Sequence, residues 1–311
     1  QNMKVLFMGT PDFAVSTLKS IIEAGHELIG VVTQPDKVRG RGSKVSYSPV
    51  KEAALEYNLK VYQPVKVRDE EFIQMVDDMQ PEVIVVAAFG QILPKRLLDI
   101  PPYGCINVHA SLLPKYRGAA PIQAAILNGE EETGITIMHM DVKLDTGDMI
   151  LQESIPISKD DTGGSLHDKL ALLGGELLVK ALDKLKDGSA KRIPQDDSKA
   201  TYVKMMDKEM GRIDFNQPAT VIERMIRGLN PWPSAFTKYE GKNMKLWRAE
   251  VVESSSDAKP GEVIEADKES FIVMTAKDAL VIKEVQLECK KRMPCGAFLR
   301  GCPIEKGVIL G

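Results

Sequence analysis

The stretch GCINVHASLLPKYRG, residues 104–118, decides how the rest of this chain is interpreted. It begins with a short apolar strand, residues 105–108, and runs into a turn at Pro114. Alternate side chains of a strand share one face, so Asn107 and His109 are expected to point the same way. An amide N–H and an imidazole at the end of a strand can stabilise the negative oxygen that forms when a nucleophile adds to a carbonyl. The alternative is a structural role, in which these polar groups only satisfy the backbone of the turn.

Apolar segments separated by helical patterns surround this strand. The expected strands are residues 4–8, 27–33, 61–62, 82–88 and 105–108. Their side chains are mostly apolar rather than alternating, which indicates a parallel sheet covered on both faces. The sequence therefore predicts an α/β fold that opens with a Rossmann-like, mostly parallel sheet domain. The segment after the first strand, GTPDFA at 9–14, lacks the G-x-G-x-x-G pattern, and this disfavours a nicotinamide enzyme.

The composition changes between residues 187 and 206, where Gly, Ser, Pro and acidic residues replace sustained apolar runs. Beyond this segment, one helical pattern precedes short strands expected at 234–239, 244–252, 261–266, 270–276 and 279–285. Several short strands in so few residues are typical of a small barrel, a fold often used to bind oligonucleotides. We therefore predict a catalytic domain at residues 1–188, a linker at 189–207 and an OB-like β-barrel domain at 208–311.

The overall composition is that of an ordinary globular protein. The 311 residues are 43% hydrophobic and 27% charged, with a formal net charge of −3. No apolar run reaches the ~20 residues that a membrane helix needs, and the N-terminus has no apolar segment long enough for a secretory signal. The four cysteines show no C-x-x-C spacing, and the four histidines are scattered. We therefore expect a cytoplasmic protein with free thiols, no metal site and no membrane attachment.

A second segment, DVKLDTGD at residues 141–148, follows another expected strand. If this loop meets the end of the strand that carries Asn107 and His109, Asp145 adds a carboxylate to the carboxamide and the imidazole. A nearby carboxylate favours the charged form of an imidazole. That charged ring suits an oxyanion, and the carboxylate can accept a proton. No Ser or Cys is spaced for a covalent mechanism, since Cys105 falls on the apolar run. The three groups predict direct transfer of an acyl or formyl group to an amine.

These motifs in combination resemble the folate-dependent formyltransferase family. The pattern N-x-H at 107–109 leads into SLLPKYRG at 111–118, and DTG follows at 145–147. Further similarity lies in FMGTPDFA at 7–14, TQPD at 33–36, GRG at 40–42, GAAPIQ at 118–123 and NPWP at 230–233. The similarity covers most of the chain and thins after about residue 250. One departure is Ala110, where the family commonly has Gly; it does not touch the three catalytic candidates.

The resemblance implies 10-formyltetrahydrofolate as formyl donor, methionyl initiator tRNA as acceptor and tetrahydrofolate as product. It implies catalytic roles for Asn107, His109 and Asp145. It also implies two sets of binding residues. The folate-binding set is Phe89, Gly90, Ser111, Leu112, Leu113, Pro114, Asp141 and Leu144. The tRNA-binding set is Lys37, Arg39, Arg41, Lys44 and Lys208. We further expect a monomer.

The segment between Pro35 and Lys51 is basic and rich in glycine, which predicts a flexible, positively charged loop. Such a loop is either an ordinary solvated surface or a contact for phosphates. In the family it reaches toward the acceptor end of the tRNA. Two alternatives remain open: a formyltransferase that acts on glycinamide ribonucleotide or a sugar nucleotide, and a tRNA-binding protein without activity. The first lacks a carboxyl-terminal barrel or usually lacks the basic loop. The second would not need the three catalytic candidates together.

Overall fold

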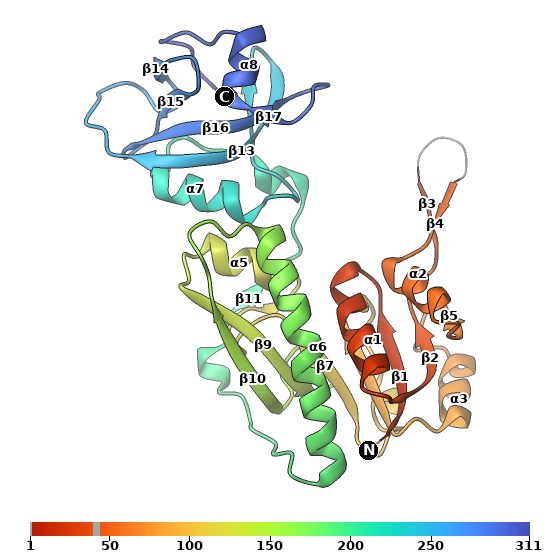
Figure 1. The fold of residues 1–311 in the computed structure, drawn as a ribbon. Coiled ribbons are helices and arrows are strands. Elements are labelled where there is room, and N and C mark those ends of the chain that lie inside the picture. Colours follow the sequence, from red (N-terminus) through yellow and green to blue (C-terminus); the bar gives the residue numbers. More distant parts are fainter. Residues whose placement is uncertain (1, 40–43) are drawn as a thin grey trace. The chain divides into compact units, whose positions relative to one another are not determined.

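The computed structural model of the chain describes residues 2–38 and 44–311, together with the backbone of Arg39. Arg41 lies outside the described residues. The chain divides into two compact units (Figure 1). The first comprises Gln1–Pro121, Glu132–Pro156 and His167–Val203, and the second comprises Ile122–Glu131, Ile157–Leu166 and Lys204–Gly311. Each unit is built around its own large sheet.

The first unit contains a seven-stranded sheet in the order β10-β9-β7-β6-β1-β2-β5. Its strands are β1 (Lys4–Gly9), β2 (Glu27–Val32), β5 (Val61–Tyr62), β6 (Val83–Ala87), β7 (Cys105–His109), β9 (Glu132–His139) and β10 (Met149–Pro156). The five strands from β5 to β7 run parallel, and β9 and β10 add to the β7 edge as antiparallel strands. This arrangement is the predicted Rossmann-like, mostly parallel sheet.

Helices cover both faces of this sheet. They are α1 (Asp12–Glu23), α2 (Pro49–Glu56), α3 (Glu70–Met79), α4 (Lys95–Leu98) and α6 (Gly163–Asp187), which begins in the second unit. Apolar side chains of β1 and β6, among them Leu6 and Ile84, pack with Phe72 of α3 and Leu97 of α4. On the opposite face, Val108 of β7 lies under α6. Because each fully buried aliphatic side chain contributes about 1.5–3 kcal/mol, both layers stabilise the sheet.

Local sequence signals explain where several of these helices begin and end. Ser48 precedes α2, and its hydroxyl accepts a hydrogen bond from the backbone N–H of Lys51 at 3.0 Å, as expected of an N-cap. Pro49 occupies the first helical position, where its missing N–H costs nothing. After α1 the chain turns at Gly25, which has a φ of +82°. Glycine adopts this conformation without the steric penalty that a Cβ would bring.

The second unit contains a curled antiparallel sheet in the order β12-β13-β16-β15-β14, with β17 paired to β16. Its strands are β12 (Phe236–Tyr239), β13 (Lys242–Val252), β14 (Val263–Ala266), β15 (Phe271–Met274), β16 (Ala279–Leu287) and β17 (Met293–Pro294). Its helices are most of α5 (Pro121–Leu127), α7 (Ala219–Gly228) and α8 (Cys295–Gly301), with the short 3-10 turn η2 (Lys208–Gly211). One apolar core joins α7, α8 and the inner face of the sheet. The predicted fold class, a Rossmann-like sheet followed by a small OB-like β-structure, is confirmed.

Two segments that the sequence marks as irregular contain regular pairing. The basic segment forms a hairpin, β3 (Lys37–Arg39) with β4 (Lys44–Ser46). Within the expected linker 189–207, β11 (Tyr202–Val203) pairs in parallel with β8 (Arg117–Gly118), and η1 (Asp197–Lys199) forms a 3-10 turn. Neither segment buries many apolar side chains, so neither has a hydrophobic pattern that would reveal it.

Candidate functional site

The candidate site begins at the carboxyl ends of β1, β6 and β7. The chain leaves β1 toward β2 on one side, while β6 and β7 lie on the other side. In open α/β sheets, ligands bind at such a reversal of strand order. The Thr10 hydroxyl, just after β1, donates a hydrogen bond to the Phe89 carbonyl, just after β6, at 2.7 Å. The ends of these two strands are therefore held together.

His109 is the last residue of β7 and is 7% exposed. Its Nε2 lies 2.9 Å from the Tyr116 carbonyl oxygen. Because a carbonyl can only accept, Nε2 carries the proton in this hydrogen bond. The other ring nitrogen, Nδ1, faces the Asp145 carboxylate, with 3.7 Å between Nδ1 and Oδ1. The imidazole is thus fixed in orientation, with one edge on backbone and the other on a carboxylate.

Asp145 comes from the loop between β9 and β10 and is also 7% exposed. Its second carboxylate oxygen, Oδ2, accepts a hydrogen bond from the Gly118 backbone N–H at 2.8 Å. The residue has a φ of +57°, a left-handed conformation that costs a non-glycine residue roughly 1–2 kcal/mol. The fold thus holds Asp145 in a disfavoured backbone conformation with its carboxylate between His109 and Gly118. This placement meets the condition under which the sequence predicts a catalytic trio.

Asn107 lies two residues before His109 on β7, so its side chain projects from the same face of the strand. Cys105 occupies the same face one step earlier and packs in the apolar core, where burial raises the pKa of its thiol well above the usual range. A buried thiol with a raised pKa is a poor nucleophile. Asn107 itself is half-buried. The polar residues of this face therefore begin where the apolar core ends.

The predicted folate-binding residues fall into two groups. Phe89, Ser111 and Leu113 are buried, and their polar groups are already paired: the Ser111 hydroxyl donates to the Lys115 carbonyl at 2.7 Å. Leu112 and Pro114, next to them in the turn, are half-buried. Gly90, Asp141 and Leu144 form the exposed group. Leu144, which is 61% exposed, is an apolar residue in contact with solvent in the Asp145 loop.

The predicted tRNA-binding residues lie in two places. Lys37 and Arg39 belong to β3 and Lys44 to β4, whereas Arg41 lies outside the described residues. The Cα partners in this hairpin include Arg39 and Lys44, so two basic residues stand directly opposite each other. Lys208 is exposed in η2 of the second unit.

The base of the β3–β4 hairpin is fixed by the Asp36 carboxylate. It accepts hydrogen bonds from the Gln63 amide at 2.7 Å and from the Lys51 ammonium at 2.9 Å. These two hydrogen bonds lower the pKa of Asp36. The residue that precedes β3 is therefore held in place by side chains of two other segments of the first unit.

Comparison with known proteins identifies the family. A model of the formyl transferase family matches residues 2–182, and a model of the formyl transferase C-terminal domain matches residues 205–303. The methionyl-tRNA formyltransferase of Agathobacter rectalis is 54% identical over 305 residues, which cover 98% of either chain. That of Clostridioides difficile is 50% identical over 309 residues, 99% of this chain and 100% of that protein. This chain belongs to the methionyl-tRNA formyltransferase family. It is an enzyme of the formyltransferase class.

Solved structures of more distant formyltransferases share the fold. HypX from Aquifex aeolicus in complex with tetrahydrofolic acid is 19% identical, with a TM-score of 0.66 over all of this chain and 51% of that chain. This chain thus spans about half the length of HypX. The sugar N-formyltransferase WlaRD, with dTDP and 5-N-formyl-THF present, is 21% identical, with a TM-score of 0.68 over 94% of this chain and 100% of that chain. At these identities the likeness establishes the architecture of the formyltransferase fold.

Three residues that hold the candidate site received no role from the sequence. Tyr116 supplies the carbonyl for His109, and Gly118 supplies the N–H for Asp145. Gln195 donates from its amide to the Asp145 and Gly147 carbonyls, both at 2.8 Å. Two of these contacts use backbone groups, which have no residue signature. Gln195 lies in a segment whose composition predicts only a linker.

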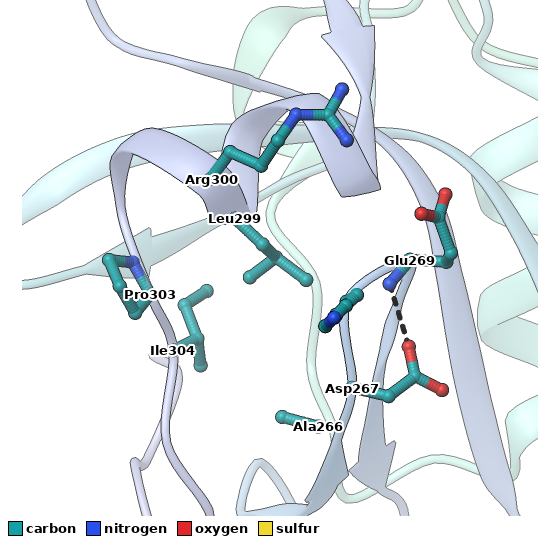
Figure 2. A pocket seen from close by; sticks show the side chains of 8 residues that line it. Ala266, Asp267, Glu269, Leu299, Arg300, Pro303 and Ile304 are labelled. Atoms are coloured by element: carbon teal, nitrogen blue, oxygen red, sulfur yellow. Dashed lines mark hydrogen bonds between the residues drawn. The ribbon is translucent and has the colours of Figure 1, made fainter.

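A pocket in the second unit lies apart in sequence from all these residues (Figure 2). It has a volume of about 480 Å³ and is lined by Ala266, Asp267, Lys268, Glu269, Leu299, Arg300, Pro303 and Ile304. The Asp267 carboxylate is paired within it, since it accepts from the Glu269 backbone N–H at 2.8 Å. The pocket contains none of the residues predicted for catalysis, folate or tRNA.

Among the described residues, no group of three or more His, Cys, Asp or Glu side chains is placed to hold a metal ion. In the same part of the chain, no helix combines the length and apolar character needed to cross a membrane.

Proposed function

We propose that this enzyme transfers the formyl group of 10-formyltetrahydrofolate to the α-amine of methionyl initiator tRNA. The products are N-formylmethionyl-tRNA, used in translation initiation, and tetrahydrofolate. The observation that carries this proposal is the pair formed by His109 and Asp145, 3.7 Å apart and both buried. Relatives that are 47–54% identical over nearly the whole chain bear the name methionyl-tRNA formyltransferase, and this supports the choice of acceptor.

Bound formylated folate would supply an electrophilic carbon, the formyl carbon attached to N10. The amine of the methionyl ester attacks this carbon directly, and the carbonyl oxygen takes up negative charge. Asn107 donates its amide N–H to this oxygen. His109 projects from the same face at the end of β7 and, when protonated, stabilises the oxygen through its positive charge, because its two ring nitrogens already face Tyr116 and Asp145. The N–C bond to the amine forms, the C–N10 bond breaks, and no covalent enzyme intermediate is required.

Asp145 accepts the proton that the attacking amine must lose, and N10 of the departing folate takes up one proton. The surroundings of the Asp145 carboxylate support this role. The residue is buried, and the Gly118 N–H fixes the orientation of the carboxylate. A general base works best when it is held within hydrogen-bond reach of the proton that it takes.

The donor would lie against two regions, namely the turn 111–114 with the adjacent Phe89 and Gly90, and the Asp141–Leu144 part of the Asp145 loop. The exposed Leu144 side chain fits contact with the flat apolar face of a pterin ring, since exposed apolar side chains at a site favour such contacts. Ser111 and Leu113 would act through the shape of the turn, because their polar groups are already paired within it.

The tRNA would be held by the β3–β4 hairpin and by the second unit. Lys37 of β3 and Lys44 of β4 are both exposed, so the hairpin presents positive charge to a polyanionic partner. Lys37, Arg41 and, in the second unit, Lys208 are the further phosphate contacts in this proposal. We further propose that catalysis belongs to residues 1–188 and tRNA binding to the barrel 208–311, in a monomeric, cytoplasmic enzyme without a metal.

The test is the reaction itself. Incubation of the enzyme with 10-formyltetrahydrofolate and charged initiator tRNA, followed by mass spectrometry of the aminoacyl group, should show formyl-methionine. Glycinamide ribonucleotide and an amino-sugar nucleotide serve as competing acceptors in the same assay. Formylation of either of these in preference to methionyl-tRNA would refute the proposed acceptor.

A further inference from the structure

The segment 193–203, here called the strap, is bound along the first unit. At one end, Ile193 and Met149 exchange two backbone hydrogen bonds, at 2.7 and 2.9 Å. At the other end, β11 pairs with β8, and the Thr201 hydroxyl accepts from the Tyr116 backbone N–H at 2.8 Å. The strap is therefore attached at Met149, just after the loop that carries Asp145, and at β8, whose Gly118 N–H binds the Asp145 carboxylate.

Arg117 joins the strap to the candidate site. Its side chain is only 2% exposed, although it carries a full charge. The guanidinium donates to Gln195 Oε1 at 2.9 Å, to Asp197 Oδ1 at 2.7 Å and to the Tyr202 hydroxyl at 3.0 Å. All three acceptors belong to the strap. Because a buried charge is unfavourable without such partners, Arg117 binds the strap firmly to this position.

The strap also fixes the backbone that holds the two catalytic candidates. The N–H groups of Arg117 and Ala119 donate to strap carbonyls at 2.9 and 3.0 Å. The Gly118 N–H between them points the other way, as alternate groups of a strand do, and donates to Asp145. The preceding Tyr116 carbonyl accepts from His109. One short segment, aligned by the strap, thus supplies the partner of the imidazole and the partner of the carboxylate.

Gln195 links Arg117 to the Asp145 loop, because its side-chain amide both accepts and donates hydrogen bonds. Oε1 accepts two hydrogen bonds from Arg117, at 3.2 and 2.9 Å. Nε2 donates to the carbonyl oxygens of Asp145 and Gly147, both at 2.8 Å. The first of these carbonyls belongs to Asp145 itself, whose left-handed conformation persists only where neighbours enforce it. The Gln195 amide is the strap side chain that does so.

We propose that the strap is part of the catalytic centre and that Gln195 is a positioning residue for Asp145. The inference rests on the proposed formyl transfer, in which Asp145 accepts a proton. Gln195 does not touch the substrates; it holds the Asp145 loop at the distance from His109 that proton transfer and oxyanion stabilisation require. A displacement of about 1 Å in such a centre costs roughly 10²-fold in rate.

The decisive variant is Gln195→Glu. A glutamate has almost the same shape and still accepts from Arg117, but it cannot donate to the Asp145 and Gly147 carbonyls when ionised. We expect kcat to fall on the order of 10-fold to 10²-fold, with little change in KM for tRNA or folate and a melting temperature close to that of the wild type. Hydrogen exchange in a peptide covering residues 141–149 should become faster. Gln195→Ala should lower both kcat and the melting temperature, because Arg117 then also loses a partner.

Ser198→Ala is the matched control, since this exposed strap residue donates its hydroxyl to Asp196 and not to the Asp145 loop. It should retain wild-type kcat and wild-type exchange in peptide 141–149. A wild-type kcat in Gln195→Glu would overturn the proposal. So would a loss of kcat that is matched by a loss of melting temperature as large as that of Gln195→Ala, because the effect would then be one of stability alone. Failure of the wild type to formylate methionyl-tRNA would instead refute the proposed function, whereas the exchange comparison tests the strap without substrate.

Discussion

At the scale of single residues, the proposed mechanism makes Asn107 and His109 separate contributors to one oxyanion site. Loss of one donor from such a site typically lowers kcat by 10²–10³-fold. We therefore expect Asn107→Ala and His109→Ala each to show a loss of about this size, with folate affinity retained in a fluorescence titration. His167→Ala is the control, because this imidazole faces the carboxylates of Asp12 and Asp168. Nearly normal kcat in either site variant would remove that residue from the oxyanion site.

His139 gives a prediction about pH and stability. Burial, and then the nearby Arg192 guanidinium, lowers the pKa of His139 from 6.5 to about 4, with Asp148 opposing the shift. Between these pH values the unfolded chain binds a proton at this residue that the folded chain does not. His139 therefore has no effect on the free energy of unfolding above pH 6.5, and it lowers that free energy by on the order of 2–3 kcal/mol as the pH falls toward 4. Urea unfolding at pH 7 and pH 4 should show a smaller loss in His139→Gln than in the wild type. Parallel losses in the two proteins would contradict this assignment.

At the scale of elements, the pairing of β8 with β11 depends on Gly118. This residue has a φ of +106°, and a Cβ built there would lie 2.4 Å from the Val203 carbonyl oxygen. Gly118→Ala should therefore separate the two strands and cost roughly 2–4 kcal/mol through strain and overpacking. Its kcat should also fall, because the Gly118 N–H orients Asp145. Gly241→Ala is the control: φ is +76° and no atom lies within 4 Å of its Cβ position, so about 1 kcal/mol is expected. Similar melting temperatures for both variants would show that β11 is not constrained by Gly118.

At the scale of the whole molecule, a net charge of −3 means that attraction to tRNA must come from local basic surface. The doubly substituted variant Lys37→Ala/Lys44→Ala should weaken kcat/KM for charged tRNA but leave the rate with a small methionyl ester unchanged. Removing one lysine that binds a phosphate should reduce the salt slope of log K by about 0.9, as for duplex DNA. Arg41→Ala should have a larger effect, because a guanidinium can bridge a phosphate and a base edge. Lys19→Ala, on α1, is the control. Equal losses with tRNA and with the ester would rule out a role of the hairpin in tRNA binding.

The sequence by itself determined the elements whose signals are local. Apolar runs separated by helical periods predicted the parallel sheet, because burial on both faces leaves this pattern in the chain. The strand Val61–Tyr62, the cap at Ser48 and the shared face of Asn107 and His109 could all be predicted in the same way. Helix α8 could not, because its seven residues make too few turns for a period to be visible.

Only the tertiary structure decided how the candidate site is closed. The sequence predicts a catalytic role for Asp145 only if its loop reaches His109. Whether it does depends on the fold, because the two residues are 36 positions apart in the chain. The position of the strap could not be predicted for a related reason. It is held by backbone pairing and by the amide of Gln195, and neither depends on an apolar pattern. Local sequence encodes which face of an element is buried, whereas hydrogen bonds between distant polar groups exist only once the chain is folded. The placement of Asp145 and its support by Gln195 are therefore properties of the folded molecule.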